Sequence, residues 1–288
     1  MTDLFKIFHI VSATTLETLP FLTLGALIAV ILEKWLPQDT LVKIVPKNPF
    51  LASLCGAGLG VVLPTCECGS VFIVRRLLMK GAPAPMAFTY MLAGPVVNPV
   101  SVLSTWTAYP ENHWIPFFRI LFVLVSALIL SFFWFRKIPP EDLFRAQASF
   151  RVHCHCGHQE NFWSSLVCEL GDLFALMTLG SFLSASIRVL APGGVWIFLR
   201  DNPTAAVPLM ALLAFLFSIC SEADAFVAAT FVSMPVASHL AFLTVGPVLD
   251  IKLTILYLST FSRKVNFALF LIMPLLLLSF SFLFQVFV

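Results

Sequence analysis

The amino-acid sequence predicts an all-α polytopic membrane protein with two inverted repeats, each having about three spanning helices plus a re-entrant (or broken) helical hairpin. Three observations support this fold class. Of the 288 residues, 59% are hydrophobic and 11% are charged, with a mean hydropathy of +0.97, whereas soluble domains are about a quarter charged. Several apolar runs approach the roughly 20 residues that cross a bilayer. Polar landmarks of the first half also recur in order in the second half.

The apolar segments define the predicted elements in chain order. The first half reads as a span, two short runs and two further spans, at residues 14–32, 50–62, 71–79, 86–106 and 115–135. The second half repeats this order within residues 162–190, 204–217, 225–232, 239–258 and 265–288. We therefore expect a first membrane repeat over 1–135, a cytoplasmic loop over 136–161 and a second membrane repeat over 162–288.

The repeat is indicated by polar positions at a nearly constant separation. Thr23-Leu24-Gly25 recurs as Thr178-Leu179-Gly180, and Glu17 is matched by Asp172, both 155 residues later. Cys66 maps onto Cys220 at 154 residues. Gly94-Pro95 maps onto Gly246-Pro247, and Asn98 maps onto Asp250, at 152 residues. Duplicated halves are common in secondary transporters.

Two polar stretches interrupt the short apolar runs. Residues 63–70 read L-P-T-C-E-C-G-S, and residues 218–224 read S-I-C-S-E-A-D. A run such as 50–62 covers about 20 Å at 1.5 Å per residue, which is less than the roughly 30 Å of the hydrocarbon core. Each pair of runs is therefore either one span broken at its middle or a hairpin that returns to the side it entered from.

Charge placement favours the hairpins, because cytoplasmic loops are enriched in Lys and Arg. Broken spans divide the basic residues 8 to 8, whereas hairpins divide them 12 to 4 and leave Lys252 inside the membrane. The side with twelve holds Lys34, Lys43, Lys47, Arg75, Arg76, Lys80, Arg136, Lys137, Arg145, Arg151, Arg263 and Lys264. The other side holds Lys6, Arg119, Arg188 and Arg200. We expect the hairpin tips to meet at mid-membrane, with the N-terminus outside.

Charged groups at membrane depth are candidates for function because burying them there is costly. The candidate substrate-binding residues are Cys66, Glu67, Cys68, Asn98, Cys220, Glu222, Asp224, Asp250 and Lys252. Lys252 lies two residues from Asp250, so the alternative for this pair is an ion pair that only fixes packing. For Glu67 and Asp224 the alternative is helix capping beside a chain break.

Three cysteines at the two tips suit a thiophilic solute such as trivalent arsenic or a soft metal ion. Cys66 and Cys68 flank Glu67, and the repeat brings Cys220 to the same place. A permanent disulfide between Cys66 and Cys68 is the weaker alternative, because a C-x-C bridge would be strained. Cys55 and Cys168 are interpreted as small packing residues.

The hydrophilic loop contains a cluster of candidate metal ligands. Its sequence H-C-H-C-G-H supplies His153, Cys154, His155, Cys156 and His158. This composition is typical of metal or metalloid capture, although the paired C-x-x-C spacing of a structural zinc site is absent. The alternative is a solvated, unstructured loop.

Four motifs together resemble the bacterial predicted permease family that includes the ArsP organoarsenical efflux permeases. They read L-P-T-C-E-C-G-S, A-G-P-V-V-N-P-V, S-I-C-S-E-A-D-A-F-V-A-A and L-T-V-G-P-V-L-D-I-K, in this order and across both halves. The resemblance implies a multi-pass permease of the cell inner membrane that exports metalloid or metal species. The H-C-H-C-G-H loop favours arsenite or a metal ion such as zinc over an organoarsenical as the expected substrate.

The leading hypothesis is proton-coupled export of a thiophilic metalloid or metal, and not an enzymatic reaction. The partners it requires are the lipid bilayer and a small inorganic or organometalloid substrate, and a homo-oligomer is compatible with it. No cofactor is required, and the His153–His158 loop could bind a metal ion. The net charge of +2 says little about partners, but no basic cluster in the sequence suggests binding to nucleic acid. The alternatives are a membrane thiol oxidoreductase using Cys66 and Cys68, and a metal-sensing membrane protein without flux.

Overall fold

The computed structural model describes residues 45–46, 48–144, 203–232 and 234–287, with isolated residues and short stretches between 7 and 27 and between 171 and 186. In these parts the regular elements are all helical, and an isolated bridge joins Phe144 to Phe261. The helices of the first half are α3 (Pro49–Val62), α4 (Glu67–Met79), α5 (Ala84–Val97), α6 (Pro99–Ala108), α7 (Trp114–Phe133), η1 (Phe135–Lys137) and η2 (Pro140–Asp142). Those of the second half are α10 (Pro203–Phe217), α11 (Asp224–Ala229), α12 (Val236–Val245), α13 (Ile251–Thr260), α14 (Arg263–Phe267), η3 (Ala268–Ile272) and α15 (Met273–Phe287).

Three helical segments in the described part are long and apolar enough to cross a membrane, namely Ala84–Ala108, Trp114–Lys137 and Arg263–Phe287. Helix α7 packs against α15 through aromatic rings, with Phe118 and Phe284 4.8 Å apart and Phe122 and Phe280 5.6 Å apart between centroids. The outer faces of the two helices expose large apolar side chains such as Phe117 and Leu275. The predicted all-α membrane fold is confirmed.

Helix α3 lies against α5 at backbone contact distance because small residues face the interface. Gly56 and Gly60 are four residues apart and so share one face of α3. A Cβ atom on Gly60 would lie 2.5 Å from Gly94 Cα, and one on Gly56 would clash with the Met86 carbonyl oxygen. Small residues spaced in this way let membrane helices approach closely.

Two spans break at their middle, as the sequence predicts. Helices α5 and α6 are separated at Asn98, whose Oδ1 accepts a hydrogen bond of 3.0 Å from Val100 N. Helices α12 and α13 are separated by residues 246–250, and Asp250 Oδ1 accepts a hydrogen bond of 2.6 Å from Leu253 N. Asn98 and Asp250, which the predicted repeat pairs, therefore cap the second helix of each broken span.

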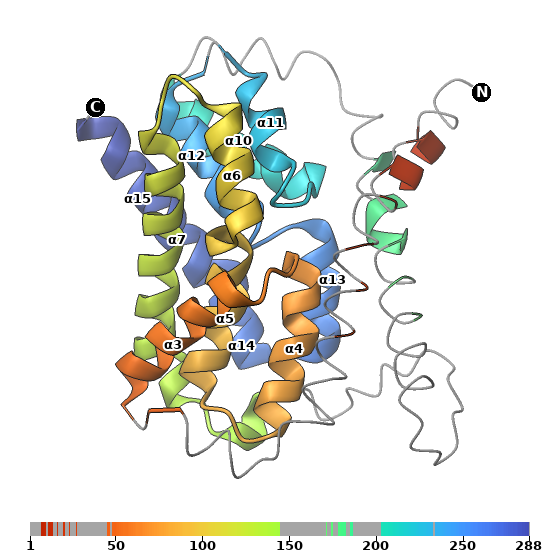
Figure 1. Ribbon diagram of the computed structural model, residues 1–288, viewed down its shortest axis with the longest axis vertical. Helices are drawn as coiled ribbons and strands as arrows, with labels where there is room; N and C mark the ends of the chain where they lie inside the picture. The colour runs from red at the N-terminus through yellow and green to blue at the C-terminus, as the bar shows by residue number, and fades with distance from the viewer. Residues whose placement is uncertain are drawn as a thin grey trace.

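Two helical hairpins reach the middle of the molecule from opposite ends. Figure 1 shows α3 and α4 in one half and α10 and α11 in the other. Helix α4 begins at Glu67 and not at Val71, because Cys66 caps it and the motif residues form its first turn. Helix α11 ends at Ala229, three residues earlier than predicted. Gly81, with φ of 85°, lies in the turn that follows α4.

Basic residues gather at one end of the described structure. Lys264 Nζ donates a 2.6 Å hydrogen bond to Asp142 Oδ2, so the start of α14 lies beside the segment after α7. The end of α4 and Arg136 line one cavity there. This is the grouping expected for hairpins and not for broken spans. Arg119, which we expected at the opposite end, is instead buried.

The inverted repeat and the unit boundaries at 135 and 161 stay predictions. The helices that would complete the symmetry, predicted at residues 14–32 and within 162–190, fall mostly outside the described residues. Residues 136–144 at the start of the predicted loop are described and include η1 and η2.

Candidate functional site

The predicted site residues converge where the two hairpin tips meet the two broken spans. All nine are buried: Cys66, Glu67, Cys68, Asn98, Cys220, Glu222, Asp224, Asp250 and Lys252. Non-helical backbone at membrane depth is tolerated only where protein buries it or where it lines a wet cavity. The arrangement therefore satisfies the first of these conditions at both tips.

The first tip is fixed by the start of α4. Cys66 Sγ accepts a hydrogen bond of 3.4 Å from Gly69 N, which makes Cys66 the N-cap. Ser70 Oγ donates to the Glu67 carbonyl oxygen at 2.7 Å. Thr65 and Tyr90 hydroxyls lie 2.9 Å apart and tie the tip to α5. The capping alternative considered for Glu67 thus applies to Cys66, and the Glu67 carboxylate is left for other contacts.

The second tip is an irregular segment between α10 and α11. Ser218 has a φ of 48°, and its hydroxyl accepts a 3.1 Å hydrogen bond from Ile251 N at the start of α13. The Ser221 carbonyl oxygen accepts from Ser101 Oγ at 3.0 Å and from the Arg119 guanidinium at 3.1 Å. Hydrogen bonds from three other elements therefore hold this tip.

The tips meet at a group of three ligand atoms. Glu67, Cys220 and Glu222 each place one potential metal-ligand atom within 4.8 Å of the other two. Ser221 Oγ donates to Glu67 Oε2 at 3.3 Å, while Glu67 Oε1 and both Glu222 oxygens are buried without a hydrogen-bond partner in the described structure. Two carboxylates and one thiol could hold a borderline metal ion.

The thiols are not equivalent. Cys220 belongs to this group, whereas Cys66 caps α4, and neither Cys66 nor Cys68 is among its members. The four cysteines described, which include Cys55, are all free, so the structure contains no Cys66–Cys68 disulfide. Cys55 is exposed on α3.

Arg119 is the site-adjacent residue that the sequence reasoning missed. It is 1% exposed, and its guanidinium lies 2.8 Å from Asp224 Oδ2 and 2.5 Å from Thr105 Oγ1. The available signal was its position four residues inside the predicted span 115–135, where a cation requires a partner. Asp224 is therefore neutralised by an ion pair between α7 and α11.

Asp250 and Lys252 form a looser buried pair, with Asp250 Oδ2 3.8 Å from Lys252 Nζ. Lys252 Nζ has no hydrogen-bond partner in the described part. Gly180 makes room for this lysine, since a Cβ atom there would lie 2.8 Å from Lys252 Cγ. Asn98 Nδ2 also has no hydrogen-bond partner among the described residues, so each broken span carries a buried polar atom that makes no hydrogen bond.

Comparison with known proteins identifies the family to which this chain belongs. The model of a predicted permease family, ArsP_1, matches residues 3–286. The chain belongs to this predicted permease family. It is similar to the "UPF0718 protein YcgR" of Bacillus subtilis (strain 168), 30% identical over 266 residues, 88% of each chain. It is also similar to a Streptococcus mutans protein named "Putative two-component membrane permease complex subunit", 32% identical over 256 residues, 86% of this chain and 85% of the relative. No solved structure matches.

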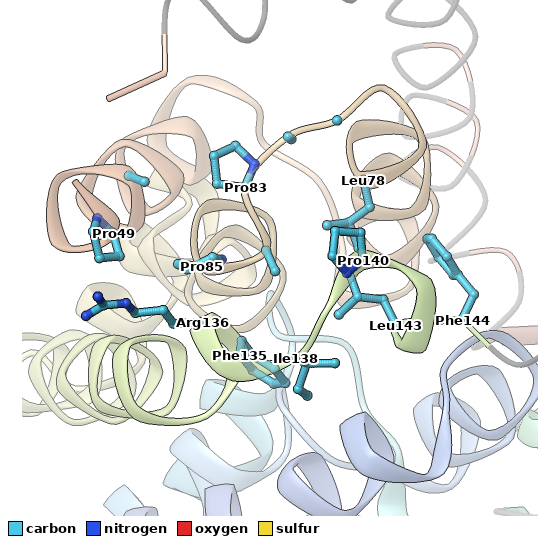
Figure 2. Close-up of a pocket in the computed structure, with 14 residues that line it drawn as sticks. Pro49, Leu78, Pro83, Pro85, Phe135, Arg136, Ile138, Pro140, Leu143 and Phe144 are labelled. Atoms are coloured by element: carbon cyan, nitrogen blue, oxygen red, sulfur yellow. The ribbon is translucent and has the colours of Figure 1, made fainter. Parts of the chain in front are cut away.

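Family membership and the apolar helices together place the chain in the bacterial plasma membrane as a multi-pass protein. Two surface cavities of this permease-family protein lie away from the predicted site residues. One, of about 420 Å³, is lined by α3, the α4–α5 turn and the segment after α7 (Figure 2). The other, of about 330 Å³, is lined by Tyr109, His239 and neighbouring residues. The predicted ligands His153, Cys154, His155, Cys156 and His158 lie outside the described residues.

Proposed function

We propose that this protein is a permease that exports a thiophilic metalloid or metal species across the plasma membrane in exchange for protons. The observation that supports it most is the buried group of Glu67, Cys220 and Glu222 at the contact between the two hairpin tips. Buried carboxylates can hold either a cargo ion or protons, and such groups mark ion pathways and proton relays in membrane proteins. The thiol adds affinity for soft cargo.

Transport through this site requires no covalent chemistry, so we propose a transporter and not an enzyme. Cargo would reach the tips from the basic end of the molecule, where the segment after α7 leads into the His153–His158 cluster that we propose as a capture site. Asn98, Asp250 and Lys252 would line the path on the broken spans, because each is buried and has a side-chain polar atom without a hydrogen-bond partner in the described part. The name of the Streptococcus mutans relative supports a second membrane subunit as a partner.

A deletion strain complemented with the gene tests the proposal. It is challenged with arsenicals, antimonite, zinc, cadmium and copper, and wild-type protein should restore resistance to one of them. Glu67→Gln and Cys220→Ser should abolish this resistance while immunoblots show normal amounts in the membrane, because both residues belong to the buried group. Cys55→Ser is the matched control, since Cys55 is an exposed thiol on α3. Full resistance with both Glu67→Gln and Cys220→Ser would remove the proposal. Uptake into everted vesicles separates flux from metal sensing.

A further inference from the structure

Charge balance at the hairpin tips distinguishes between classes of cargo. Six Asp, Glu, Lys or Arg side chains are buried in the part of the chain that the structure describes: Glu67, Arg119, Glu222, Asp224, Asp250 and Lys252. Arg119 pairs with Asp224 at 2.8 Å, and Lys252 pairs with Asp250 at 3.8 Å. Among the described residues Glu67 and Glu222 have no ion-pair partner. Two uncompensated buried carboxylates attract a cation and do not favour a neutral hydroxide such as arsenous acid.

The ligand set points in the same direction. Trivalent arsenicals are bound through several thiols, as expected for soft centres. Here only one thiol, that of Cys220, belongs to the described group, and the other two ligand atoms are carboxylate oxygens. A mixed set of carboxylate and thiolate ligands suits a borderline or soft divalent cation.

The geometry leaves these ligands available. Both oxygens of Glu222 and one of Glu67 are buried without a hydrogen-bond partner among the described residues, although buried polar atoms are normally paired. Ligand atoms around a tetrahedral Zn²⁺ lie about 3.4 Å apart, given bonds of about 2.0–2.3 Å. The three atoms lie within 4.8 Å of one another, so small side-chain rotations would bring them into coordination.

We propose that the cargo of this permease is a divalent cation of the Zn²⁺ and Cd²⁺ class, bound by Glu67, Glu222 and Cys220 with a fourth position left open. This inference rests on the proposed export function and narrows its substrate. Three protein ligands and an open position allow the ion to be handed on, whereas four protein ligands would make a closed structural site.

Cadmium titration of purified full-length protein in lipid nanodiscs tests the site. The protein used carries the substitutions Cys154→Ser, Cys156→Ser, His153→Ala, His155→Ala and His158→Ala, so that the loop does not compete for the metal. We expect one Cd²⁺ per chain, a thiolate-to-cadmium charge-transfer band in the ultraviolet, and displacement by Zn²⁺. Cys220→Ser should abolish the band, and Glu222→Gln should weaken binding at least tenfold. Cys55→Ser should change neither. Thermal unfolding and size-exclusion profiles verify that each variant is folded.

The inference is overturned if the folded chain binds no Cd²⁺, if the band persists in Cys220→Ser, or if an equimolar trivalent phenylarsenical displaces the Cd²⁺. Flux of Cd²⁺ into everted vesicles separates this inference from the proposed function. Binding at Cys220 without flux supports the site and contradicts a permease. Flux of another solute without Cd²⁺ binding supports a permease and removes the metal assignment.

Discussion

Ser221 Oγ donates a hydrogen bond to Glu67 Oε2 at 3.3 Å across the contact between the two hairpin tips. The two residues are 154 positions apart, which is also the separation of Cys66 and Cys220 in the predicted repeat. Matching positions of two repeats touch only close to the axis that relates them. The bond therefore lies where an inverted repeat would place its symmetry axis, and it orients one carboxylate of the proposed cargo site.

Ser221→Ala should weaken cargo binding, because it removes this donor to the Glu67 carboxylate. A hydrogen bond to a charged group contributes about 1.5–3 kcal/mol, so we expect the apparent affinity for Cd²⁺ to fall about tenfold or more. Ser221→Thr keeps a hydroxyl and should retain most of the affinity. The measurement is Cd²⁺ titration of both variants, and equal affinity of Ser221→Ala and wild type would show that the contact does not orient Glu67 for binding.

Arg119 and Asp224 should behave as one unit in stability measurements. Removing one partner of a buried ion pair leaves an uncompensated charge and costs about 3–5 kcal/mol, so Arg119→Met and Asp224→Leu should each lower the midpoint of thermal unfolding in detergent. The double variant should be more stable than either single variant, because neither charge of this pair is left buried without its partner.

The matched control for this pair is Lys264 and Asp142, whose side chains are 65% and 46% exposed. Exposed ion pairs contribute about 0–1 kcal/mol, so Lys264→Met should change the unfolding midpoint little. Strictly additive losses in the Arg119 and Asp224 double variant would contradict the coupling.

Close packing of α3 on α5 depends on Gly56, and Gly58 offers the control on the same helix. Gly56→Ala would push a methyl group into the Met86 carbonyl, whereas a Cβ atom on Gly58 meets nothing within 4 Å. Overpacking costs about 1–3 kcal/mol, and Ala in place of an exposed helical Gly is neutral or stabilising by up to about 1 kcal/mol. Thermal unfolding should therefore separate the two variants, and similar midpoints would show that α3 can shift away from α5.

The sequence was sufficient to predict the fold class, the break near Asn98 and the break before Asp250. Proline, glycine and a capping side chain interrupt otherwise apolar runs at these points, and such signals are local. Local signals also placed the short runs at 50–62 and 204–217, which became α3 and α10. The start of α4 was missed by four residues, because a cysteine is an uncommon N-cap.

Long-range pairing could not be predicted in the same way. Arg119 was counted as a charge outside the membrane, although its partner Asp224 lies 105 residues away in the chain. The grouping of Cys220 with Glu67 and Glu222, and the separate role of Cys66 as a cap, depend on how two tips dock. The three thiols look alike in the sequence, and only their three-dimensional surroundings distinguish them.

Asn98 and Asp250 cap helices that the predicted repeat pairs, but of the two only Asp250 also faces a buried cation. Asn98→Ala should cost about 1 kcal/mol, the usual value of an N-cap, and Asn98→Ser should restore it. Asp250→Asn keeps a capping oxygen but leaves Lys252 without its counter-charge, so we expect a loss of about 3–5 kcal/mol. The double variant Asp250→Asn and Lys252→Met removes both charges and should recover most of this loss. The measurement is thermal unfolding, in detergent, of the wild type and these four variants. If Asp250→Asn is as stable as Asn98→Ser, another group neutralises Lys252, and Asp250, at 3.8 Å, is not its main partner.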